Sequence, residues 1–216
     1  MKAKFSSFAA LTICLLLLAS GAFAGSIPVA NGNFDALPAG GWQACDGTGC
    51  YNYSLGIPRW STTGFTGQWQ PASGYLQPYS GDSYIGWTSP GGTIAQDVLT
   101  RAVAGDTYTL TVEIGTRSDY GPPAGVAQLT LNGGVVATAT GTYGVGNTWS
   151  LFTARFTATG AQAGEKLGIL LSASGGPQGD FDAVTLSVPE HSTLATLLGF
   201  GIFNLAAVFG FRRKLT

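Results

Sequence analysis

Apolar and polar residues alternate in short runs along the middle of the chain. In residues 107–114, Tyr108, Leu110, Val112 and Ile114 fall on one side of an extended backbone, while threonines and one glutamate fall on the other. A period of two with one polar face predicts a strand that is buried on one side only.

The same pattern, interrupted by glycine-rich turns, predicts a series of strands. The clearest cover residues 82–87, 93–98, 107–115, 126–131, 135–139, 148–157, 166–173 and 181–188. Asn132-Gly133 predicts a tight hairpin, because Asn-Gly supplies the positive φ angles of such turns. No stretch of residues 25–188 shows a helical period over ten or more positions. The pattern therefore predicts an all-β fold, an antiparallel β-sandwich of the jelly-roll type.

A strongly apolar segment precedes this region. Lys2 and Lys4 stand before the apolar stretch 8–19, and a small-x-small motif ends at Ala24. This order is typical of a secretory signal peptide, so residues 1–24 are predicted to be removed after Ala24.

A second apolar segment lies near the C-terminus. Residues 194–211 form an 18-residue run without charge, which as a helix would rise about 27 Å, close to the thickness of a bilayer core. Arg212, Arg213 and Lys214 follow it and are expected to stay cytoplasmic. The run therefore predicts one transmembrane helix, with residues 25–188 on the outer side of the membrane.

Pro189-Glu190, the apolar run and the basic end together resemble the PEP-CTERM sorting signal, over residues 189–216. The resemblance implies an exosortase-type protease as partner and cleavage near Pro189 and Glu190. It also implies transient anchoring in the inner membrane, followed by release to the cell surface or extracellular matrix. His191 stands where a second proline is usual in that family. The alternative is a permanent single-pass anchor.

Charge and cysteine content narrow the choice of partners. Residues 25–188 contain five basic and ten acidic residues, a net charge of 5 − 10 = −5, which argues against nucleic acid as a partner. Cys45 and Cys50 are the two cysteines left after removal of the signal peptide. Outside the cytoplasm such a pair is expected to form a disulfide that closes one loop.

Several short motifs resemble galactose-binding-like β-sandwich domains, including carbohydrate-binding modules. They are Asn31-Gly-Asn-Phe-Asp35, Ile94-Ala-Gln-Asp-Val98, the strand entrance at residues 103–112 and the closing Asp180-Phe-Asp-Ala-Val-Thr-Leu186. The resemblance covers most of residues 25–188 and implies the same type of sandwich.

That resemblance also implies a structural calcium ion. By analogy with several such modules, Asp35 and Asp182 would be its ligands, with hard carboxylate oxygens supported by backbone carbonyls. The alternative is that Asn31 and Asp35 cap a turn, while Asp180 and Asp182 face solvent where a strand begins.

Aromatic residues are concentrated between residues 42 and 87, which hold four of the five tryptophans. Rings on exposed loops can stack on sugars while amide side chains bind hydroxyl groups. The best candidates for contact with an extracellular polysaccharide are Trp69, Tyr75, Gln68, Gln70 and Gln77. The alternative is that these rings fill the core.

An enzyme is not expected from the sequence. The one histidine, His191, lies outside residues 25–188, so neither a Ser-His-Asp nor a Cys-His arrangement can form within them. Neither a phosphate-binding loop nor a zinc motif is present. The sequence therefore predicts a non-catalytic exported module that binds polysaccharide or, alternatively, a structural matrix protein without a specific ligand.

Overall fold

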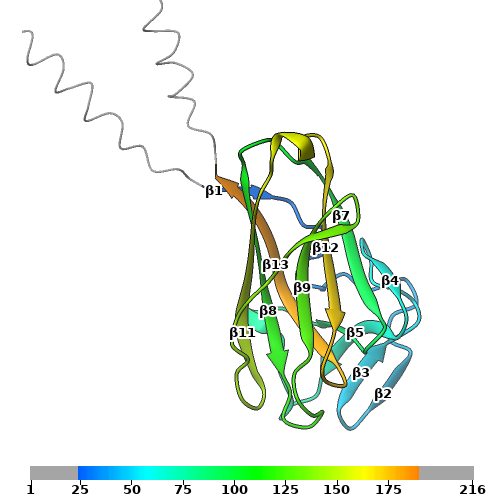
Figure 1. The fold of residues 1–216 in the computed structure, drawn as a ribbon. Coiled ribbons are helices and arrows are strands. Elements are labelled where there is room, and N and C mark those ends of the chain that lie inside the picture. The colour runs from blue at the N-terminus through cyan, green and yellow to red at the C-terminus, as the bar shows by residue number, and fades with distance from the viewer. Residues whose placement is uncertain (1–23, 190–216) are drawn as a thin grey trace, which may run out of the picture. The chain divides into compact units, whose positions relative to one another are not determined.

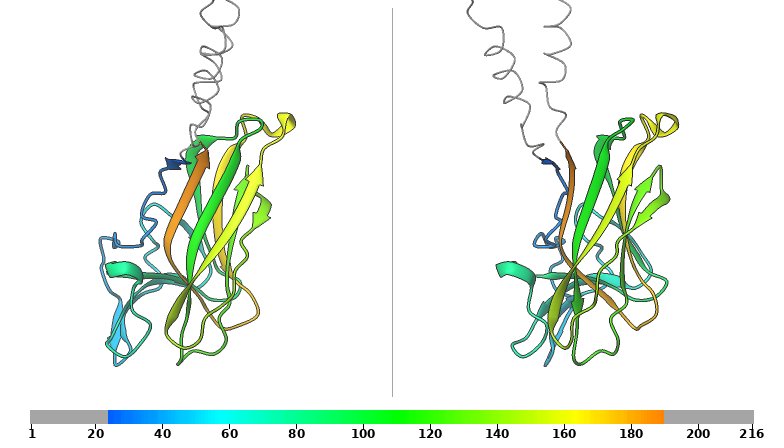
Figure 2. Two further views of the ribbon diagram at one scale, coloured as in Figure 1. Left: turned by 90° about the vertical axis from the view of Figure 1, so that its left-hand side faces the viewer. Right: turned by 60° about the vertical axis from the view of Figure 1, so that its left-hand side comes forward.

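Two antiparallel sheets pack face to face in the computed structural model, which describes residues 24–189 (Figure 1). The first sheet has the strand order β11-β8-β13-β6-β5-β3-β2, with β1 also paired to β13; the second has the order β10-β9-β12-β7-β4. Side views show them as two layers (Figure 2). The predicted all-β antiparallel sandwich is confirmed, and its assignment to the jelly-roll type stays a prediction.

The strand bounds follow the predicted pattern closely in the second half of the chain. The first sheet contains β1 (Ala24–Ile27), β2 (Ala44–Asp46), β3 (Gly49–Asn52), β5 (Thr66–Pro71), β6 (Ile85–Thr88), β8 (Thr107–Thr116), β11 (Thr148–Thr157) and β13 (Gly179–Pro189). The second contains β4 (Ser61–Thr63), β7 (Thr93–Arg101), β9 (Gly125–Leu131), β10 (Gly134–Thr138) and β12 (Lys166–Ala173). Asn132 and Gly133 join β9 to β10 with φ angles of 46° and 83°, which confirms the predicted tight hairpin.

The main core lies between the two sheets. Tyr108, Leu110, Val112 and Ile114 of β8 are each at most 1% exposed, as their alternation predicts. They pack against apolar residues of the second sheet such as Leu129. Burial of these apolar faces is the main contribution to the stability of the sandwich.

A second, smaller core lies on the opposite face of the first sheet, which we call the outer face. Trp69, Leu76, Ile85 and Trp87 form it. Trp69 is paired with Ile85 across β5 and β6, so their side chains project from the same face. Residues 72–84 fold over this face. Leu76 packs directly on Gly115 of β8, so closely that a Cβ at Gly115 would lie 2.4 Å from the Leu76 side chain. The covering segment creates the surroundings of the candidate site.

The expected anchoring in the membrane is not supported by the part of the chain that the structure describes. In the stretch from residue 24 to residue 189, no helix is both long and apolar enough to cross a bilayer. The predicted membrane helix at residues 194–211, Glu190, and the basic residues Arg212, Arg213 and Lys214 lie outside the described residues. Transient membrane anchoring therefore has no supporting helix in the described part, and this localisation is withdrawn. The resemblance to a sorting signal stays a prediction.

Candidate functional site

A pocket of about 310 Å³ opens beside the outer face of the first sheet. Its walls are rich in aromatic rings and carry a few polar groups. The lining residues are Ala44, Asp46, Tyr51, Tyr53, Phe65, Trp87, Arg117, Tyr120 and Gln178. Five of these nine residues are aromatic, so the pocket suits a small ligand that is largely apolar and has a few polar groups.

One wall of the pocket is the hairpin formed by β2 and β3. Cys45 and Cys50 face each other across it and are joined by a disulfide, which confirms the predicted loop closure. At its turn, Asp46 Oδ1 accepts hydrogen bonds from Thr48 N at 2.8 Å and Thr48 Oγ1 at 2.7 Å. The bond from the Thr48 side chain is the largest effect that lowers the pKa of Asp46 below its ordinary value. Asp46 therefore presents a stable carboxylate at neutral pH.

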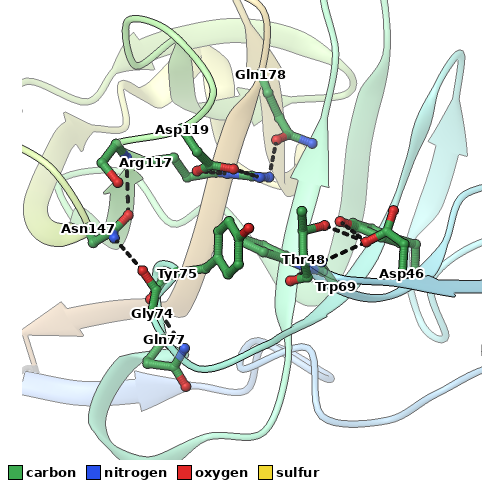
Figure 3. Close-up of polar contacts among 12 residues, drawn as sticks. Asp46, Thr48, Trp69, Gly74, Tyr75, Gln77, Arg117, Asp119, Asn147 and Gln178 are labelled. Carbon is green, nitrogen blue, oxygen red and sulfur yellow. Dashed lines mark hydrogen bonds and ion pairs between the residues drawn. The ribbon is translucent and has the colours of Figure 1, made fainter.

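The positive charge of the pocket is Arg117, which follows the end of β8. Its guanidinium lies 4.0 Å from the Trp69 ring centroid and 4.8 Å from that of Tyr120. Its Nη2 pairs with Asp119 Oδ2 at 2.6 Å, and its Nη1 donates to Gln178 Oε1 at 2.9 Å (Figure 3). Ring stacking and these bonds hold the buried guanidinium in one orientation.

A buried acid, Asp180 of β13, lies next to this cation. Asp180 is paired with Trp87 of β6 and with Gly115 of β8, so its side chain projects from the same outer face. It is 3% exposed, and its Oδ1 has no hydrogen-bond partner among the described residues. Burial raises the pKa of Asp180 to about 7; the charge of Arg117 opposes this rise and that of Asp119 adds to it. Asp180 therefore holds a proton over part of the neutral range.

The predicted sugar-binding rings lie elsewhere. Trp69 was expected to be exposed, and this is wrong: it is 1% exposed. It stacks on Tyr51 at 6.2 Å and meets Tyr75 edge-on at 6.3 Å, because residues 72–84 fold back over it. Tyr75 is half-buried in the same cluster. Neither ring lines the pocket, and Trp69 contacts the lining residues Tyr51 and Arg117.

The three predicted glutamines have separate surroundings. Gln68 is fully buried on the inner face, where its Nε2 donates to the backbone oxygens of Phe34 and Ala36. Gln77 Nε2 donates to two carbonyls within the covering segment. Gln70 is exposed and paired with Cys50. None of the three lines the pocket, so the structure does not bring the five predicted residues together as one ligand-binding surface.

The predicted calcium ligands hold backbone groups in place. Asp35 Oδ1 accepts from Ser83 N at 2.7 Å and Tyr84 N at 3.2 Å, while Asp182 accepts from Tyr79 N at 2.9 Å and from its neighbour Ala183. Burial raises the pKa of Asp182 to about 8, although the hydrogen bonds from Tyr79 N and Ala183 N oppose this rise. Within residues 24–189, no group of three or more His, Cys, Asp or Glu side chains is placed to hold a metal. Calcium therefore stays a prediction.

The alternative to calcium binding was a capped turn at Asn31 and Asp35, with Asp180 and Asp182 facing solvent. It is right for Asn31 and wrong for Asp180 and Asp182. Asn31 Oδ1 accepts from Ala36 N at 2.9 Å, as expected of a side chain that caps a turn. Asp180 and Asp182 were expected to face solvent, but they are 3% and 0% exposed. Residues 72–84 fold over the part of β13 that contains Asp180 and Asp182. The sequence of β13 alone does not predict this burial.

Several polar residues in and beside the pocket were not predicted from the sequence. Arg117, Asp119, Tyr120 and Gln178 lie in loops that follow β8 and precede β13. Arg117 is one of only five basic residues in the region 25–188, and an acidic residue follows two positions later. A rare arginine beside an aspartate was the available signal.

Two of the solved structures that are similar to this chain are a cyclase and a xylan-binding domain. A cyclase from Fischerella sp. TAU is 21% identical, with a TM-score of 0.61 over 79% of this chain and 100% of that chain; this likeness shows a shared fold. The xylan-binding CBM22-1 domain of Paenibacillus barcinonensis Xyn10C is 12% identical, covers 81% of this chain and 99% of its own, and has a TM-score of 0.44. None of the curated proteins matches the sequence.

The expectation that the chain is not an enzyme is contradicted. It depended on the missing histidine, yet a buried carboxyl such as Asp180 can also transfer protons. The family model described as HpiC1-like, HpiC1 cyclase, matches residues 23–187. Because this match spans most of the sequence, the chain belongs to the HpiC1-like cyclase family.

Proposed function

We propose that the chain is a cyclase, which closes a ring within a small unsaturated substrate held in the pocket. The observation that carries the proposal is an aromatic pocket lined by Arg117, with the buried carboxyl of Asp180 directly beside that cation. The family supports the reaction type, since its model bears the name of a cyclase.

The pocket lining indicates the class of substrate. Five aromatic residues, among them Tyr53, Phe65 and Trp87, favour a largely apolar molecule. Their ring faces attract positive charge, and a carbon skeleton becomes positively charged when one of its double bonds takes up a proton. Arg117 lies over the ring of Tyr120 in the pocket wall, and its ion pair with Asp119 offsets its charge beside the apolar walls.

The proposed reaction is an isomerisation. The carboxyl of Asp180 donates a proton to one carbon of a double bond, which leaves its neighbour cationic. The electron pair of a second double bond in the same molecule attacks this cation and forms the ring bond. Loss of a proton from an adjacent carbon then gives a cyclic isomer of the substrate without any co-reactant.

Two carboxyl groups fit the two proton transfers. Asp180, which is buried beside the lining residue Arg117, has a pKa raised to about 7 and acts as the acid. Asp46, which lines the pocket, has a lowered pKa and is the carboxylate that accepts the final proton. Environments that drive two pKa values apart are typical of acid and base pairs.

The test uses geranyl acetate, an acyclic ester with two double bonds, within a panel of acyclic dienes in D₂O. The full-length chain is expected to give a cyclic isomer that carries one deuterium on carbon, detected by gas chromatography and mass spectrometry. Asp180→Asn is expected to abolish conversion, while Asp97→Asn, a change at an exposed ion pair with Lys166, is expected to keep it. Binding of the panel without any conversion would overturn the proposal.

A carbohydrate is a second candidate ligand for the same pocket. The specific observation is that ring faces lie beside Asp46, Arg117 and Gln178, and sugars are bound by this combination of stacking and hydrogen bonding. A glycan array distinguishes the two: binding that is lost in Phe65→Ala, together with no conversion of any diene, would favour a polysaccharide as the natural ligand.

A further inference from the structure

The disulfide of Cys45 and Cys50 lies within the wall of the pocket. Ala44 and Asp46, on either side of Cys45, both line the pocket, as does Tyr51 beside Cys50. Since neighbouring side chains in a strand point to opposite faces, the sulfur atoms lie on the face away from the lining side chains. Cys45 is exposed, so a reductant can reach the bond without entering the pocket.

The two strands joined by this bond are anchored unequally. The turn into β3 is tied to the rest of the sheet, because Thr48 O accepts from Ala72 N at 2.9 Å and from Trp69 Nε1 at 3.3 Å. Gly49 packs so closely here that a Cβ would lie 2.6 Å from Trp69 Nε1. When the disulfide breaks, β3 therefore keeps its position.

Strand β2 has much weaker attachments. It is three residues long, exposed along its whole length, and stands at the end of the sheet with β3 as its one neighbour there. Gln43, just before it, is held through Tyr51 O at 2.8 Å and through its own side chain. Residues 44–47 are thus the part of the wall that depends most on the covalent link.

We propose that thiol–disulfide exchange at Cys45 and Cys50 regulates the pocket. A dithiol supplies the two electrons: its thiolate attacks Sγ of Cys45, Cys50 leaves as a thiolate and takes up a proton, and the second thiol of the reductant then releases Cys45 as a thiol. The reductant departs as its own disulfide. Residues 44–47 then move away from the pocket, and ligand binding weakens because the wall is no longer preorganised.

This inference depends on the proposed use of the pocket, but its test does not measure cyclisation. The probe is 1-naphthol, an uncharged aromatic molecule, titrated calorimetrically into the full-length chain in its oxidised form and after reduction by dithiothreitol. Loss of preorganisation is expected to raise its Kd by about fivefold or more. Hydrogen exchange of residues 44–47 is expected to rise on reduction while that of β12 stays unchanged.

A double variant controls for the reductant itself. Cys45→Ser with Cys50→Ser is expected to show the Kd and exchange of the reduced chain with or without dithiothreitol. Equal exchange at residues 44–47 in the oxidised and reduced chains overturns the proposal, whether or not 1-naphthol binds. Failure of diene conversion with an intact redox response would instead refute only the proposed reaction.

Discussion

Replacing Asp180 by Asn should change how the stability of the protein depends on pH. The carboxyl is 3% exposed, and burial raises its pKa from 3.8 to about 7 despite the opposing charge of Arg117. Between these two values the folded state keeps a proton that the unfolded state releases. The free energy of unfolding of the wild-type chain therefore falls as the pH rises from about 4 to about 7, and then levels off.

The size of the effect follows from the pKa shift. About three pKa units at 1.36 kcal/mol each correspond to roughly 4 kcal/mol between the two ends of this range. Asn resembles the protonated acid in shape and does not titrate, so Asp180→Asn should lack this part of the decline. The measurement is urea unfolding of the oxidised wild-type and variant chains at pH 4, 5, 6, 7 and 8. Other titrating groups, such as Asp182, are present in both chains, so their contributions cancel in the difference.

A matched control separates burial from charge removal. Asp97→Asn also removes one carboxylate, but this group is 57% exposed and paired with Lys166. Exposed pairs contribute about 0–1 kcal/mol, so the control should follow the wild-type curve within that margin. If the wild-type and Asp180→Asn curves run parallel from pH 4 to pH 8, then Asp180 does not hold a proton in the folded state, and its proposed role as acid is refuted.

Three further predictions concern the surroundings of the site. Trp69→Ala should lower the free energy of unfolding by about 3–5 kcal/mol, because Trp69 is 1% exposed; urea unfolding measures this, and a loss under 1 kcal/mol would contradict the packing described. Asp119→Asn should move the pH midpoint of diene conversion downward, since Asp119 helps to raise the pKa of Asp180; an unchanged pH profile would argue against this coupling. Calcium should raise the melting temperature, since an ion that binds Asp35 and Asp182 in the folded chain alone stabilises that state, and a melting temperature indifferent to calcium and chelator would count against the ion.

The second half of the fold could be predicted from sequence because its strands are long and alternate regularly. β8 and β11 each span ten residues, so period two is visible and the buried face follows from it. The strands between residues 44 and 71 have three to six residues. In such short strands, which contain Gly, Gln and Trp, no alternation of apolar and polar residues is visible. The sequence of this region therefore predicted loops.

The site could not be predicted because its environment comes from residues 72–84. That segment turns the outer face of the first sheet, where solvent was expected, into a second core. Burial of Trp69 and the raised pKa of Asp180 are both consequences of contacts between distant parts of the chain. The Cys45–Cys50 disulfide was predicted correctly, since a pair five positions apart needs only a hairpin to meet.

The absence of histidine from residues 25–188 limits which groups can move protons, but it does not exclude proton transfer. A carboxyl in water has a pKa near 4 and is a poor proton donor at neutral pH. Burial supplies the missing shift for Asp180, while Arg117 and its partner Asp119 act in opposite directions on the same carboxyl. The acid strength of this site is therefore set mainly by burial, and it is adjusted by how completely Asp119 neutralises Arg117. Asp119→Asn keeps the size of this side chain and removes its charge, so it should change the pH profile.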